Sequence, residues 1–151
     1  MITKSYPISK TIDFGNASVA PVFLGELEGR YYYAFTEEVA PPSGGKNVSA
    51  DEVEKIKQSS LLFKQIKRKT EEEITKVAPL WQQVNALVDL VLLMNKPDLT
   101  AEERSAITDA KELLMQVHGL RDKSNSIETG FLNGQATDYL SDHVWAQADA
   151  E

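Results

Sequence analysis

The residues best suited to metal or acid–base chemistry in this 151-residue chain lie near its C-terminus. Asp138, Asp142 and His143 are four and five residues apart, so on a helix they share part of one face. A metal site also needs neighbouring side chains that orient its ligands, and the surrounding sequence supplies none. We therefore expect an ordinary solvated helix surface here, with no metal ion and no cofactor.

No other part of the chain offers a catalytic constellation. Cysteine is absent, which excludes thiolate catalysis, cysteine metal sites and disulfides. The triplet Gly44-Gly45-Lys46 lacks the upstream glycine and the following Ser or Thr of a phosphate-binding loop. The other histidine, His118, lies beside Val117 and is expected to be partly buried at the helical hairpin or at an oligomer interface. These residues predict a protein that is not an enzyme.

The strongest pattern is instead an apolar heptad repeat, which is typical of a helix that packs along another helix. It runs over residues 53–91, and nine of its twelve core positions are apolar. The stripe over residues 80–94 is wider than two positions per heptad, which predicts burial against more than one neighbour. We assign these apolar core positions to a homo-oligomer interface: Val53, Ile56, Phe63, Ile74, Val77, Trp81, Val84, Val88 and Val91.

Capping residues and a proline divide the helical region. Ser49 with Glu52 three residues on has the pattern of a capping box, which predicts a helix from residue 50 to about 78. Pro79 removes a backbone hydrogen bond and disfavours helix at the residue before it, so a kink or break is expected there. The second helical segment then covers residues 80–94.

The next helix is expected to fold back on the previous one. Residues 95–99 are a short connection, and short connections join antiparallel helices. Thr100 with Glu103 predicts a second capping box at the start of a helix over residues 101–128, which Gly130 ends. A last short helix is predicted at residues 138–147.

The N-terminal part is rich in β-forming residues and is broken by glycine and proline. Its clearest hairpin joins residues 22–27 to residues 30–35 through Glu28-Gly29. Aromatic residues gather there, and such aromatic faces are frequent at protein interfaces. With so few strands, the sheet is expected to be completed by another copy or a partner. We assign these residues to partner docking: Phe23, Tyr31, Tyr33 and Phe35.

These patterns predict an elongated α+β chain with three regions. Residues 1–40 form a short antiparallel β attachment region, residues 41–48 a Pro/Gly linker, and residues 49–151 a helical oligomerisation region. The net charge is −7, and its excess lies in residues 80–151, which disfavours nucleic-acid binding. The longest apolar run is too short to span a bilayer, so no membrane association is expected.

Three helical stretches resemble a C-terminal helical module found in small virion proteins of tailed bacteriophages, around tail fibres and baseplates. These stretches are residues 79–87, 99–103 and 120–128. The resemblance implies a non-enzymatic structural or adaptor component of the virion, made in the cytoplasm of a bacterial host. It also implies contacts with other virion proteins and symmetric self-assembly. Because fibres and spikes of this class favour three-fold symmetry, a trimer is the preferred order.

Two other functions remain open from the sequence. The first alternative is a small intracellular binding module or assembly chaperone that holds one protein client through the aromatic β hairpin. Such a protein is expected to be a monomer or dimer. The acidic C-terminal half is the one feature that suggests a second alternative, a regulatory mimic of nucleic acid.

Overall fold

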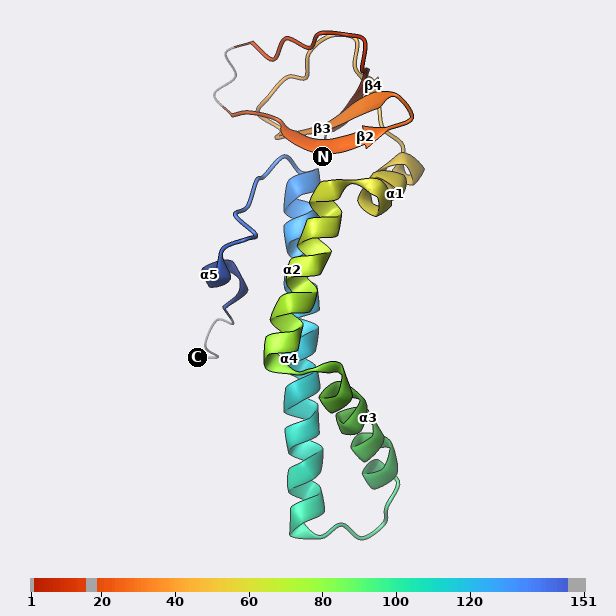
Figure 1. Ribbon diagram of the computed structural model, residues 1–151, viewed down its shortest axis with the longest axis vertical. Helices are drawn as coiled ribbons and strands as arrows, with labels where there is room; N and C mark the ends of the chain where they lie inside the picture. Colours follow the sequence, from red (N-terminus) through yellow and green to blue (C-terminus); the bar gives the residue numbers. More distant parts are fainter. Residues whose placement is uncertain (1, 16–18, 147–151) are drawn as a thin grey trace.

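The computed structural model describes residues 2–15 and 19–146 and shows an elongated molecule, with a sheet at one end and a helical arm at the other (Figure 1). The α+β class predicted from the sequence is confirmed. The antiparallel sheet has the strand order β2-β3-β1-β4. Its strands are β1 (Ile2–Pro7), β2 (Val22–Leu27), β3 (Arg30–Phe35) and β4 (Lys46–Asn47).

The hairpin between β2 and β3 forms as the sequence predicts. Glu28 and Gly29 have φ angles of 50° and 71°, and two consecutive residues with positive φ are what a tight type I′ hairpin turn requires. The register shifts between Phe23 and Gly25, so β2 carries a bulge next to its middle.

The sheet reaches four strands within the chain, without a strand from another copy or a partner. β1 pairs with β3 on one side and with β4 on the other. β4 comes from residues 41–48, which were predicted to be a linker. The Tyr6 hydroxyl also donates to the Pro42 carbonyl at 3.0 Å, so this segment is tied to the sheet.

One face of the sheet packs on the helices. Tyr32 and Ala34 of β3 point to this face and are 1% and 0% exposed. They belong to the same apolar core as Phe63 and Ile66 from the helical region. The predicted attachment region and the start of the helical region therefore share one core instead of folding around separate ones.

The first predicted helix is two helices, α1 (Ala50–Ser59) and α2 (Leu61–Val77). The Ser49–Glu52 capping box starts α1 as predicted. Ser60 then takes an extended conformation, and its hydroxyl donates to the carbonyl of Leu24 in β2. Gly25 allows this close approach, because a Cβ there would lie 3.1 Å from the Cβ of Ser60. Ser60 is thus a junction between helix and sheet, and the helix that carries the heptad repeat is interrupted there.

The break predicted near Pro79 is confirmed. α2 ends at Val77, Ala78 is extended, and α3 (Leu80–Met94) starts after Pro79. The two helices are bent by 65° relative to each other. The heptad repeat over residues 53–91 therefore does not lie on one continuous helix, and the elongation comes from the next helix.

That helix, α4 (Ala101–Leu132), runs antiparallel to α2 and α3 and packs against both in turn (Figure 1). The Thr100–Glu103 capping box is present as predicted. Its end was predicted wrongly, because the helix continues through Gly130 to Leu132. Gly134, with φ of 77°, ends it: its N–H donates to Phe131 and the next N–H, of Gln135, donates to Gly130.

After α4 the chain turns back along the helices to α5 (Asp142–Trp145), which is shorter than the helix predicted at 138–147. Residue 147 lies outside the described residues. Trp145 is 2% exposed, and its indole N–H donates to the carbonyl of Tyr139 at 2.6 Å. The Tyr139 hydroxyl in turn donates to Gln65 of α2 at 2.8 Å. The returning segment is thus fastened to α2 by side-chain packing and hydrogen bonds.

Candidate functional site

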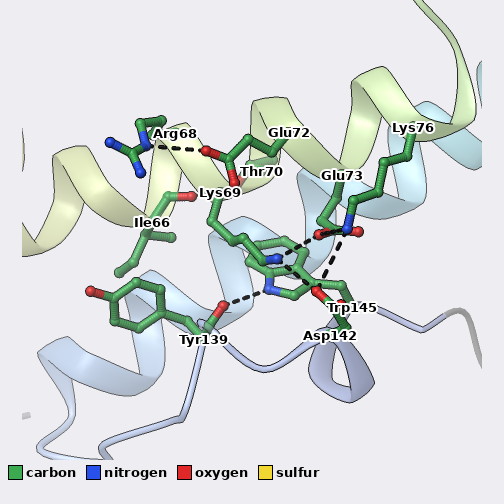
Figure 2. A network of polar contacts seen from close by, with 10 residues as sticks. All are labelled: Ile66, Arg68, Lys69, Thr70, Glu72, Glu73, Lys76, Tyr139, Asp142 and Trp145. Carbon is green, nitrogen blue, oxygen red and sulfur yellow. Dashed lines mark hydrogen bonds and ion pairs between the residues drawn. The ribbon is translucent and has the colours of Figure 1, made fainter.

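A cluster of charges joins α2 to α5 (Figure 2). Lys69 Nζ lies 2.7 Å from Glu73 Oε1 and 2.7 Å from Asp142 Oδ1, and Lys76 Nζ lies 2.6 Å from Glu73 Oε1. Burial opposes ionisation of Glu73, but hydrogen bonds from Lys69 and Lys76 outweigh it and hold the Glu73 pKa below its usual value. The hydrogen bond from Lys69 likewise lowers the pKa of Asp142, and those carboxylates raise the pKa of Lys69. These matched charges hold α5 in place and offer no free acid or base.

The C-terminal residues considered for metal binding are not assembled into such a site. Asp142 is engaged by Lys69, and among residues 2–15 and 19–146 no group of three or more His, Asp or Glu is placed to hold a metal ion. The Ser141 hydroxyl contacts Nδ1 of the exposed His143. In the described chain no carboxylate hydrogen-bonds that ring, so the third member of a catalytic triad is lacking.

His118 was predicted to be partly buried at the helical hairpin or at an oligomer interface, and within the single chain it is not buried. Its side chain is 73% exposed on α4, with Nε2 3.3 Å from Asp122 Oδ2 one helical turn on. The pair is a surface contact between neighbours on one helix.

The heptad residues fall into two groups. Ile56, Phe63 and Ile74 are 1%, 0% and 9% exposed because they pack into the core of their own chain. Assigning them to an oligomer interface was wrong, since a heptad spacing is satisfied equally by a neighbour in the same chain. Val53 and Val77 are half-buried, and Val77 packs against the same core.

The remaining heptad residues are on the surface of α3. Trp81, Val84, Val88 and Val91 are 62%, 47%, 48% and 66% exposed. Further exposed apolar residues extend this surface beyond the interface assigned from the sequence: Leu80, Leu87, Leu92 and Met94. The signal for them was the wide apolar stripe over residues 80–94, where eleven of the fifteen residues are apolar, which is typical of a helix with more than one neighbour. We call these eight residues the α3 outer face.

The α3 outer face lies opposite the contact with α4. Ala86 is buried toward α4, and Leu90 and Leu93 are half-buried. At 100° per residue, the eight exposed residues span an arc of about 160°, and the single charged residue of α3, Asp89, falls outside it. From their exposed fractions these residues present roughly 1,000 Å² of surface, well above the roughly 300–600 Å² of the largest apolar patch on a typical monomer.

Most aromatic side chains of the sheet are buried or pack against other aromatic rings of the same chain. Phe35 is 1% exposed, so its assignment to partner docking was wrong. Tyr33 is half-buried, with its ring centroid 5.0 Å from that of Phe14 and 5.2 Å from that of Phe23. Tyr31 is also half-buried, and Phe23, at 48%, is the most exposed of the four assigned residues. A small exposed aromatic spot remains at this end of the molecule.

Comparisons of the chain with models of protein families, with curated proteins and with solved structures find no match. In the described part of the chain, no single helix is long and apolar enough to cross a membrane. α2 and α3 meet that criterion of length and composition only when taken together as a bent pair.

Proposed function

We propose that this chain is a non-enzymatic structural or adaptor protein that assembles with copies of itself through the α3 outer face. The observation that carries the proposal is the size of that face: eight large apolar side chains exposed together on a single helix. Leaving such a surface in water is costly, at about 25 cal/mol for each Å² of apolar area. Covering it by association would recover that free energy.

The arrangement of the two ends supports an adaptor role. The α3 outer face lies on the arm, and strand β2, which carries the exposed Phe23, lies at the other end (Figure 1). α4 runs from one end to the other, so a partner on the sheet and a partner on the arm can be held at the same time. The matched charges around Lys69 serve the fold and do not compete with this interpretation.

Substituting Trp81 tests the self-assembly. Trp81→Glu places a charge within the proposed contact, and the full-length variant is expected to be a monomer where the parent chain is an oligomer, as measured by light scattering after gel filtration. The matched control is Met115→Glu, because Met115 is 72% exposed on α4, where it lines a pocket with Trp145 of α5 outside the α3 outer face. It should keep the parent mass. A monomeric parent chain at micromolar concentration would refute the proposal.

We further propose that the assembly is part of a tailed-phage virion, as a tail-fibre or baseplate component. The support is the resemblance of residues 79–87, 99–103 and 120–128 to a helical module of small virion proteins. Mass spectrometry of purified particles should then detect the chain in fixed proportion to the other tail proteins. Its presence in the lysate but not in the particles would instead favour an assembly chaperone, for which the exposed Phe23 is the candidate client contact.

A further inference from the structure

We propose that the partner of the α3 outer face is α3 of a second copy, packed antiparallel about a two-fold axis. The two α3–α4 hairpins would then meet through their α3 helices, with each α4 on the outer side of the pair and the sheets at opposite ends. This inference rests on the proposed self-assembly and adds the order and the direction of the pairing. Three independent features of the face lead to it.

The first feature is the absence of charge. A two-fold interface places the same surface of each copy against itself, so every charge near the axis meets its own like charge. The chain has a net charge of −7, which repels copies of itself, but the arc of the α3 outer face contains no charged residue. An interface with a different protein is under no such constraint, because its charges do not meet copies of themselves. Neutrality therefore favours self-pairing.

The second feature is the symmetry of the spacing. Trp81, Val84, Val88 and Val91 lie five and two residues before and after position 86. When two such helices run antiparallel with position 86 opposite position 86, Trp81 meets Val91 and Val84 meets Val88 of the other copy. The large Trp81 then packs against the smaller Val91. The centre contains valines alone, which permits the two helices to approach closely. These are the alternate a-to-d layers of an antiparallel helix pair.

The third feature is the area. A stable complex of standard size buries about 800 Å² on each partner. The α3 outer face presents roughly 1,000 Å², so the face of one second copy suffices to cover it.

Single cysteines provide a direct test, because the natural chain has none. Val84→Cys and Val88→Cys change little volume, and each is made in the full-length chain, one of them with a short tag. In the antiparallel pairing residues 84 and 88 are opposite each other, whereas the two copies of residue 84 are offset along the helix. The mixture should therefore form the tagged–untagged disulfide about ten times faster than either variant forms its own.

The outcomes separate this inference from the proposed function. A dimeric mass with rapid 84-to-88 crosslinking supports the antiparallel pair. Rapid crosslinking of each variant with itself means parallel arms, and a trimeric mass means three-fold symmetry; either result overturns the antiparallel dimer and leaves self-assembly standing. A monomeric parent chain refutes both proposals. Circular dichroism of each variant checks that its helices are intact before crosslinking is compared.

Discussion

Replacing Phe63 by alanine is expected to lower the free energy of unfolding by about 3–5 kcal/mol. Phe63 is 0% exposed and lies in the core that joins α2 to the sheet and to α4. Its removal leaves a cavity that the sheet and α4, held by their own hydrogen bonds, cannot fill by collapsing. Denaturant unfolding followed by circular dichroism measures the change.

The matched control is Leu61→Ala, two residues earlier on the same helix. Leu61 is 69% exposed, so this variant should stay within about 0.5 kcal/mol of the parent chain. Because Phe63 and Leu61 lie on the same helix but differ in burial, comparing the two variants isolates the contribution of core burial to stability. If Phe63→Ala changed the oligomer mass and left the stability of the single chain unaltered, Phe63 would face another copy, as the heptad alone predicted.

Removing residues 1–40 is expected to abolish cooperative unfolding of the remaining chain. The deletion takes away Leu24, Tyr32 and Ala34, whose side chains cover the buried faces of α1 and α2. Each lost contact of a large apolar residue is worth about 1.5–3 kcal/mol, and together they consume much of the roughly 5–15 kcal/mol that stabilises a domain. Thermal melting followed by circular dichroism should show a broad transition and reduced helicity.

The sequence favours the opposite expectation, that the helical part folds without residues 1–40. If residues 41–48 were a linker between separate modules, the helical part would fold alone. The control is Phe23→Ser, which removes the exposed aromatic ring and leaves the core face of the sheet intact. It should retain full helicity and a sharp transition. A truncated chain that melts as sharply as the parent would show that the helices fold without the sheet.

The elements governed by local interactions could be predicted from the sequence. The Glu28-Gly29 turn, the capping boxes at Ser49 and Thr100, and the break at Pro79 each depend on residues within four positions of one another. Side chains and backbone groups that are close in sequence impose them, so the correct strands and helices follow. The wide apolar stripe of α3 could also be predicted from the sequence, because it is a property of a single helix.

Features that depend on distant contacts could not be predicted. Ser60 interrupts the first helix because its hydroxyl reaches the carbonyl of Leu24, 36 residues earlier. Gly130 and Gly134 are equally plausible helix ends locally. Gly134 is the one that ends α4, and a Cβ there would lie 2.6 Å from the backbone of Phe35 and Thr36. The sequence near residue 134 contains no pattern that predicts that contact.

Only four of the eight residues of the α3 outer face were predicted from the sequence, for a related reason. The heptad spacing identifies residues that need an apolar neighbour, and it does so without regard to which chain supplies the neighbour. For Phe63 the neighbour is the core of the same chain, and for Trp81 it is absent from the monomer. Only the folded arrangement of α2, α3 and α4 separates these two cases.

The uninterrupted course of α4 has a mechanical consequence. Its 32 residues extend for about 48 Å, and one ladder of backbone hydrogen bonds runs through that whole length. A helix braced by α2 over one part and by α3 over another resists both bending and twisting. A rotation imposed on the arm is therefore transmitted to the sheet with little loss, and the molecule behaves as a lever and not as two bodies on a hinge.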